Sequence, residues 1–170
     1  MEILMLVIGL LGLAGLIAFR PLLEVSPSNP IDPRQPFSVP FKITNTGLLA
    51  IRDVTIYCYI HRVEVGPLMV TNCVVGQPDW NINKLDRGES KTIICRLVQA
   101  PTMPSDADIA IVVDHKAFGV PFKVLRRVFR FIGQYGATWQ WLPQPSADIQ
   151  SSVRVYVPYQ PFRPRKPPFR

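Results

Sequence analysis

The sequence predicts a mainly β protein with a membrane helix at its N-terminal end and an extended basic tail at its C-terminal end. Three observations lead to this fold class. Residues 3–19 carry no charge, apolar and polar residues alternate through residues 22–132, and 18 of the 170 residues are proline, which breaks helix interiors. We therefore expect a single transmembrane helix over residues 1–20, an antiparallel β-sandwich over residues 21–142, and an extended Pro/Arg-rich tail over residues 143–170.

The apolar run from Ile3 to Phe19 predicts one membrane-spanning helix. Such a helix is roughly 25 Å long, at the short end of the range for a span. Pro21 then ends it. A cleaved secretory signal is disfavoured because no Lys or Arg precedes the run and no A-x-A site follows it. Small residues let helices approach closely, although glycine is also common in membrane helices generally, so four positions are candidates for membrane-helix packing: Gly9, Gly12, Gly15 and Ala18.

The orientation of the predicted span rests on two positive charges. Arg20 and Arg34 both follow the apolar run, and the positive-inside rule places such residues in the cytoplasm. We therefore expect a bacterial inner-membrane protein whose folded domain faces the cytoplasm. Because sandwich domains behind N-terminal anchors are often exported, the periplasmic orientation stays open.

Alternating stretches predict about seven short strands over residues 22–132. The first, PFSVPFKIT, places four apolar residues on one face, and Pro40 within it indicates an edge strand. The turn NTG at Asn45–Gly47 separates it from VTIYCYIHRV, and PLMVTNCVV, SKTIICRLV, DADIAIVVD and VPFKVLRRVFRFI follow. Arg127 interrupts the apolar face of the last stretch, which indicates a bulge. The apolar positions of these strands predict the core: Phe37, Val39, Phe41, Ile43, Val54, Ile56, Cys58, Ile60, Ile93, Cys95, Leu97, Ile109, Ile111, Val113, Leu125, Phe129 and Phe131.

One part of the chain resembles a known class of module. The stretch PRQPFSVPFKITNTGLLAIRDVTIYCYI, followed by LDRGESKTIICRL, resembles bacterial Ig-like modules of the CARDB-like type over about residues 33–97. Those modules share a strand ending in N-x-G, a D-V-x-I strand and an L-x-x-G-E turn. The resemblance implies an Ig-like sandwich that serves as a binding or spacer unit rather than as an enzyme.

The three cysteines have no metal-binding or redox spacing. Cys58 and Cys95 both point inward on predicted strands, so they can face each other across the sandwich. In an exported domain they would form an inter-sheet disulfide, whereas in the cytoplasm they would be buried thiols. The cytoplasmic orientation favours thiols. Cys73 has no partner in either case, and no C-x-x-C pair is present.

No catalytic, cofactor or metal site emerges from the sequence, and we expect a protein that is not an enzyme. His61 and His115 belong to no cluster with metal-ligand spacing. Asp106 and Asp108 share a strand face and could mimic paired carboxylates, but the start of a polar strand is the simpler interpretation. Phosphate loops and nucleophile elbows are absent from the sequence.

Two tryptophans and the basic tail are the candidate partner-binding residues. Trp139 and Trp141 share a face of an extended chain, where they serve either as exposed partner anchors or as packing at the sandwich edge, and Trp80 is a second surface candidate. Val153–Val157 predicts one more strand. Residues 116–170 hold ten Lys/Arg and one acidic residue, whereas residues 1–115 hold nine and eleven. The final stretch interleaves aromatic and basic residues with prolines that favour an extended conformation: Tyr159, Phe162, Arg163, Arg165, Lys166, Phe169 and Arg170.

These features predict a non-catalytic accessory subunit that stabilises a larger membrane-protein complex. Other membrane subunits are the expected partners. Anionic lipid headgroups are a second target for the tail, nucleic acid is disfavoured because no binding motif is present, and a free solubilising tail is the simplest interpretation. An energy-transducing host, such as a photosynthetic or respiratory complex, would suit a subunit of this kind. The alternative is a membrane-anchored, exported Ig-like binding module of the cell envelope.

Overall fold

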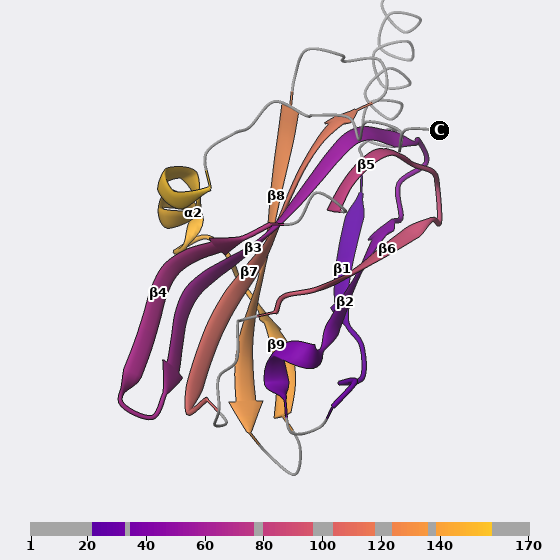
Figure 1. Ribbon diagram of the computed structural model, residues 1–170. Helices are drawn as coiled ribbons and strands as arrows, with labels where there is room; N and C mark the ends of the chain where they lie inside the picture. The colour runs from indigo at the N-terminus through magenta and orange to yellow at the C-terminus, as the bar shows by residue number, and fades with distance from the viewer. Residues whose placement is uncertain are drawn as a thin grey trace, which may run out of the picture.

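The computed structural model describes residues 22–32, 35–76, 80–96, 104–117, 124–135 and 139–157. Over these residues the protein is mainly β, with nine strands in two antiparallel sheets and one short α-helix (Figure 1). The predicted membrane helix over residues 1–20 and the predicted tail beyond residue 157 lie outside the described residues. Within the described part of the chain, no helix has the length and apolarity that crossing a membrane requires.

The smaller sheet has three strands in the order β1-β2-β6. They are β1 (Leu23–Pro27), β2 (Pro40–Asn45) and β6 (Ser90–Ile94). Two expectations for its central strand are corrected. The 3-10 helix η1 (Pro36–Ser38) replaces the first residues of the predicted strand. The strand β2 also lies between two partner strands rather than at an edge of the sheet. Pro40 is tolerated there because it is the first residue of its strand, where a missing N–H removes little pairing.

The larger sheet has six strands, five of them in the order β4-β3-β7-β8-β9, with β5 also paired to β3. The long strand β3 (Ile51–Val65) organises it, because its C-terminal half pairs with β4 (Leu68–Val75) and its N-terminal half with β5 (Asn81–Leu85). The opposite edge of β3 pairs with β7 (Asp106–Ala117), which continues to β8 (Val124–Tyr135) and β9 (Trp139–Gln144). β-branched and aromatic residues fill β3, as a strand buried on both faces requires.

The core between the two sheets contains the apolar residues that alternation predicts. Each predicted core residue that the structure describes on β2, β3, β6 and β7 is buried, with Ile43, Val54, Ile60 and Ile109 fully so. On β8 Phe131 is buried, and Phe129 packs partly buried against the core. The bulge expected at Arg127 is wrong, because β7 and β8 pair without interruption from residue 107 to residue 116.

β3 itself contains a bulge that changes which residues face the core. The register between β3 and β7 shifts between Ile60 and Arg62. From Val54 to Ile60 the even-numbered residues face the inter-sheet core, and beyond the shift Val63 and Val65 do so instead. Opposite this point on β4, Asn72 adopts a left-handed φ of 54°, a conformation that asparagine tolerates better than most residues.

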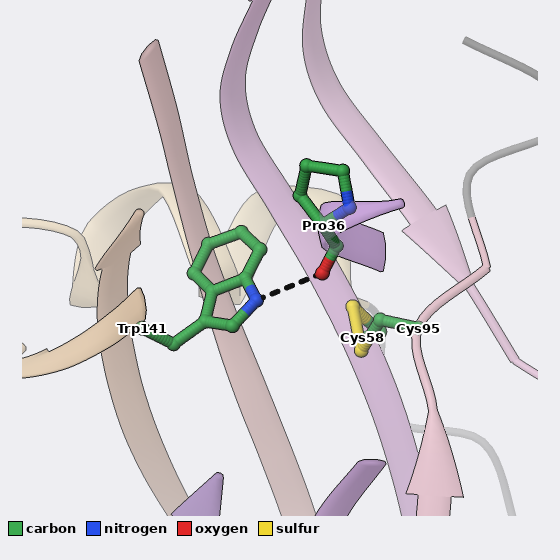
Figure 2. Close-up of a disulfide and its surroundings, with 4 residues drawn as sticks. All are labelled: Pro36, Cys58, Cys95 and Trp141. Atoms are coloured by element: carbon green, nitrogen blue, oxygen red, sulfur yellow. Dashed lines mark hydrogen bonds between the residues drawn. A yellow bond between two sulfur atoms is a disulfide. The ribbon is translucent and has the colours of Figure 1, made fainter. Parts of the chain in front are cut away.

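A disulfide joins the two sheets. Cys58 on β3 is bonded to Cys95, which directly follows β6, with a Cα–Cα distance of 5.8 Å (Figure 2). Both residues are almost completely buried, and Cys73 remains free. The favoured expectation of buried thiols is therefore wrong, and the disulfide that had been the alternative is present.

The outer face of the larger sheet carries a second, smaller core beneath a helix. The helix α2 (Gln150–Tyr156) lies against this face, and Ile149, Val153 and Val157 pack on Tyr59 and the apolar residues of β7. The strand expected at Val153–Val157 is wrong. Four-residue spacing of those three apolar residues suits one face of a helix, whereas the β-branched composition suggested a strand. The predicted extended tail is likewise corrected over residues 143–157, which form a strand end, a turn and this helix.

Candidate interaction site

The tryptophan pair is buried, which decides between the two interpretations that the sequence left open. Trp139 and Trp141 are 3% and 4% exposed, and they meet edge to face with ring centroids 5.7 Å apart. The Trp141 indole N–H donates to the Pro36 carbonyl at 3.1 Å (Figure 2), and its ring lies 5.7 Å from that of Phe37. The pair therefore belongs to the sandwich core, which was the alternative interpretation. Trp80, also expected at the surface, is 4% exposed.

Glycine at position 133 makes room for the first of these tryptophans. A Cβ placed on Gly133 would lie 2.0 Å from a ring carbon of Trp139. Gly133 is on β8, directly opposite Trp141 on β9. The indole thus lies flat across the neighbouring strand, an arrangement that any larger residue would block.

A hollow of about 270 Å³ borders the tryptophan pair. It lies between the strand β9 and the end of β1 with the residues that follow β1. Its wall combines apolar side chains with the polar side chains of Ser28, Asn29 and Gln140. The residues that line it are Pro27, Ser28, Asn29, Pro30, Val39, Trp139, Gln140, Trp141 and Leu142. The indole N–H of Trp139 is buried without a hydrogen-bond partner. The lining holds no charged side chain that could fix a ligand or act as an acid or base.

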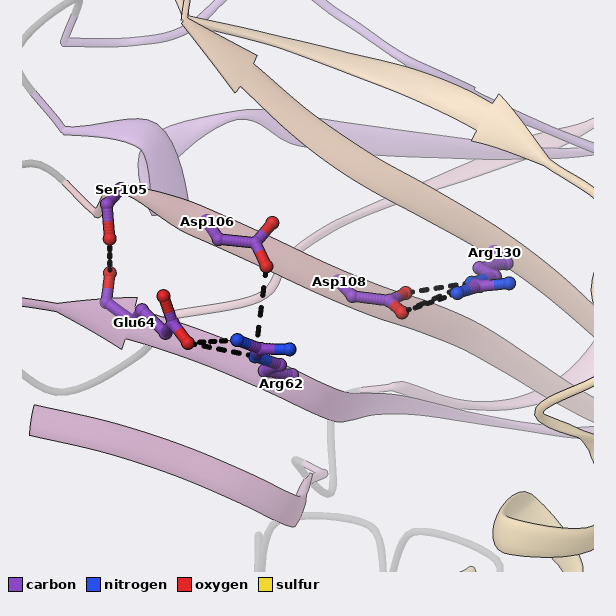
Figure 3. A network of polar contacts seen from close by, with 6 residues as sticks. All are labelled: Arg62, Glu64, Ser105, Asp106, Asp108 and Arg130. Atoms are coloured by element: carbon purple, nitrogen blue, oxygen red, sulfur yellow. Dashed lines mark hydrogen bonds and ion pairs between the residues drawn. The ribbon is translucent and has the colours of Figure 1, made fainter.

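Two buried ion pairs cross the outer face of the larger sheet. Arg126 binds Asp114 through two hydrogen bonds of 2.6 and 2.7 Å, and Arg130 binds Asp108 at 2.7 Å (Figure 3 shows the latter pair). Asp114 lies directly across from Arg126 on β7 and β8, whereas Asp108 lies opposite Ile132 and reaches Arg130 diagonally. The hydrogen bonds to the carboxylates raise the pKa of both guanidinium groups, so both arginines stay charged. Asp108 is therefore engaged in an ion pair with Arg130.

The same arginines hold the C-terminal helix on the sheet. Arg126 also donates to the Val157 carbonyl at 2.6 Å, and Arg130 donates to the Asp148 carboxylate at 2.5 Å. That second contact lowers the pKa of Asp148. Beside them the Tyr59 hydroxyl donates to the Asn72 side chain at 2.5 Å. Val157, the last described residue before the basic segment, is therefore fixed on the outer face of the sheet.

His115 is fully buried, and neither ring nitrogen has a hydrogen-bond partner. Burial first, and then the positive charge of Arg127, lower its pKa to about 4. The imidazole is consequently neutral at physiological pH. Among the described residues, no group of three or more His, Cys, Asp or Glu side chains is placed to hold a metal ion.

A polar network occupies the surface where β3 ends and β7 begins. Arg62 pairs with Glu64 on its own strand and approaches Asp106 at 3.8 Å across to β7, while Ser105 bonds the Glu64 carbonyl (Figure 3). The Arg62 side chain is half exposed. Solvent-exposed pairs of this kind contribute little to stability and offer no enclosed site for a reaction.

Exposed apolar side chains occur on β4 and on the helix α2. Five of the exposed large hydrophobic side chains among the described residues lie on β4 and on α2, which contact each other. We call these five residues the β4 patch: Leu68, Met69, Val74, Val155 and Tyr156. The patch could not be predicted from the sequence, because PLMVTNCVV predicts a strand without indicating that it lies at an edge.

Comparison of the chain with family models, with curated proteins and with solved structures found no match.

Proposed function

We propose that this chain is a membrane-anchored, non-catalytic binding module whose disulfide-bonded domain lies on the oxidising side of the membrane. The observation that carries the proposal is the bond between Cys58 and Cys95. Disulfides persist in exported and periplasmic domains, whereas glutathione and thioredoxin keep cytosolic thiols reduced. This argument outweighs the cytoplasmic orientation, which rests on Arg20 and Arg34 alone.

The position of the disulfide also supports an Ig-like assignment for the domain. In immunoglobulin-type sandwiches the bond joins strands of the two sheets through the core, and here it joins β3 of the larger sheet to the end of β6 in the smaller one. Sandwiches of this type commonly act as binding or spacer units. The assignment remains at the level of architecture, and the function must be argued from surfaces.

The polar groups of the described domain favour binding over catalysis. Asp108 and Asp114 are both neutralised by arginines that also hold the chain in place, and His115 is enclosed away from solvent. A general acid or base must reach a substrate, and these groups do not. The exposed apolar β4 patch, by contrast, is a surface of the kind that partners cover.

An accessory subunit of a larger membrane complex is the second candidate, favoured by the way α2 is fastened. Because Arg126 bonds the Val157 carbonyl, the basic proline-rich segment starts from a fixed point on the sheet. A fixed origin lowers the ordering entropy that binding of an extended segment costs. In this version the residues 1–20 pack against other membrane helices, the domain contacts an extrinsic surface, and the tail follows that surface. A host in an energy-transducing complex belongs to this second candidate.

The experiment that tests the proposed function identifies what the full chain binds. The chain is isolated from its own membranes in mild detergent and analysed by native electrophoresis and mass spectrometry. A defined partner set that survives removal of residues 158–170 supports the binding module. A partner set that is lost on that truncation supports the accessory subunit. A matched full-length variant, in which the four basic residues of the tail are changed to glutamine, then shows whether binding depends on the charge of the tail or on its presence. These four residues are Arg163, Arg165, Lys166 and Arg170. A chain that migrates without any partner contradicts both candidates.

A further inference from the structure

The end of the domain where β1 begins carries two exposed leucines that are fixed close together. Leu22 and Leu48 are 54% and 46% exposed. The backbone N–H groups of Thr46 and Gly47 donate to the Leu22 carbonyl at 3.0 and 3.1 Å. Standard backbone dimensions then hold the Cα atoms of Leu22 and Leu48 at most about 10 Å apart. Two large apolar side chains therefore share this end of the domain, one just before β1 and one in the turn between β2 and β3.

A buried asparagine makes this end of the domain rigid. The Asn45 side-chain amide donates to the carbonyls of Leu49 and Leu85 at 2.9 and 3.0 Å. Its side-chain oxygen accepts the Gly47 N–H at 3.0 Å. The Asn45 backbone also bonds to the turn between β5 and β6, since the Gly88 N–H donates to the Asn45 carbonyl at 2.8 Å. The turn between β2 and β3 is thus tied to other parts of the chain, so its exposed leucine is presented with little further ordering entropy to lose on binding.

The chain leaves little distance between this end of the domain and the apolar run that precedes it. The run ends at Phe19, and only Arg20 and Pro21 separate it from Leu22. Three residue steps span at most about 11 Å, and the proline stiffens the connection. The headgroup region of one leaflet is roughly 5–8 Å thick. When residues 3–19 cross a bilayer, Leu22 therefore lies in or beside the headgroup region, and Leu48 lies near it.

We infer that this end of the domain rests in the interfacial region of the bilayer, with Leu22 and Leu48 in contact with lipid. The lipid surface is the occupant because a two-residue connection holds both leucines within reach of it. Arg87 adds a polar contact, since it is exposed on the turn bonded to Asn45 and its long side chain can carry its charge to lipid phosphates. The contact depends on the membrane anchor of the proposed function and extends that function by fixing the orientation of the domain.

The opposite end of the domain then faces the aqueous space. The strand β3 begins three residues after Leu48 and runs over 15 residues to Val65, so its far end is about 45 Å away along the strand (Figure 1). The hairpin that follows carries Leu68, which is 66% exposed. Leu68 is therefore the matched reference site for Leu48, an exposed leucine at the end of the domain that is remote from lipid.

The first test measures how close these two sites lie to lipid in the full chain. The chain is reconstituted in vesicles of phosphatidylcholine and phosphatidylglycerol that contain a lipid spin-labelled near its headgroup. Cys73 is changed to serine, and Leu48→Cys or Leu68→Cys then carries a polarity-sensitive fluorophore. We expect the fluorophore at residue 48 to shift its emission to shorter wavelength and to be quenched, whereas the fluorophore at residue 68 does neither. Equal behaviour at the two sites would overturn the inference.

Flotation of the same vesicles separates failure of the lipid contact from failure of the membrane anchor. A chain that floats with the vesicles while the fluorophore at residue 48 stays unquenched retains the anchor and contradicts the lipid contact. A chain that does not float contradicts both the lipid contact and the membrane-anchored function.

The second test uses charge at the exposed leucine. The fluorophore is attached through Arg87→Cys in the Cys73→Ser background, and Leu48→Glu is then added. A carboxylate at residue 48 resists burial against lipid, so quenching at residue 87 should decrease. Leu68→Glu is the matched control and should leave that quenching unchanged. Quenching that is indifferent to Leu48→Glu, or that falls equally with Leu68→Glu, contradicts the contact, and circular dichroism confirms that each variant is folded.

Discussion

Removal of the inter-sheet disulfide should destabilise the domain by an amount that follows from the loop it closes. Cys58 and Cys95 are 37 residues apart in sequence. The chain-entropy relation gives a loss of about 13 cal/mol/K for closing such a loop in the unfolded chain, or about 4 kcal/mol at 25 °C. The double variant Cys58→Ala and Cys95→Ala should therefore lose about 4 kcal/mol of unfolding free energy, with the two lost sulfur contacts adding to that.

Equilibrium unfolding in urea measures this loss on the full chain in mild detergent. Trp80, Trp139 and Trp141 are all buried, so their fluorescence reports on the core. The midpoint shift at a similar m-value gives the difference in free energy. Cys73→Ala is the control, because it removes a part-buried thiol that is in no disulfide, and it should cost about 1 kcal/mol or less. A double variant within about 1 kcal/mol of the wild type would refute the reasoning, since the bond would then not constrain the native protein.

Three further predictions concern single side chains. Gly133→Ala should destabilise the domain by about 1–3 kcal/mol in the same assay, because the new methyl group must displace the Trp139 indole. Gly76→Ala is the control and should be nearly neutral, because its new methyl group would lie 3.4 Å from the Tyr57 ring. Equal effects of the two variants would contradict the packing of Trp139 against Gly133. Arg126→Met leaves the buried carboxylate of Asp114 unpaired and should cost about 3–5 kcal/mol; adding Asp114→Leu should recover much of it, and no recovery would argue against the pair. His115 has a pKa of about 4 in the folded state and a higher pKa in the unfolded state, so the unfolded state binds the extra proton as the pH falls. The free energy of unfolding should therefore fall by roughly 3 kcal/mol between pH 6.5 and pH 4. His115→Leu should remove that slope, and a variant with the same pH dependence of stability as the wild type would show that the imidazole is not enclosed.

Alternation in the sequence was a reliable guide wherever one strand face meets the core. Phe41, Ile43, Val54 and Ile109 occupy the positions that a period of two assigns to them. This pattern is local, so it survives without knowledge of which strands are neighbours. The order of the strands is not local, which is why Pro40 suggested an edge for a strand that lies in the middle of its sheet.

Errors were concentrated where burial comes from a distant element. Val153 and Val157 suggested a strand by composition, yet they face the sheet from a helix that two arginines of β8 hold in place. The tryptophans of β9 were compatible with either exposure or burial, and Gly133 on the neighbouring strand decides the matter by leaving room for one ring. A single sequence does not show that this glycine and that indole meet.

The candidate interaction surface could not be predicted from the sequence either, because the position of a strand at a sheet edge also depends on distant elements. The apolar residues of β4 read as an ordinary strand, and their importance arises because nothing described pairs with the outer edge. The disulfide was foreseen as one of two alternatives, since Cys58 and Cys95 both face inward. The choice between them depended on the compartment, which a sequence with two flanking arginines indicates only weakly.

The oxidation state of Cys58 and Cys95 in the living cell tests the central claim most directly. Intact cells are treated with a membrane-permeant alkylating reagent before lysis, and the purified chain is then digested without reduction and analysed by mass spectrometry. We predict a peptide pair joined through Cys58 and Cys95, with alkylated Cys73. Recovery of all three cysteines in alkylated form would place the domain in a reducing compartment and contradict an exported binding module.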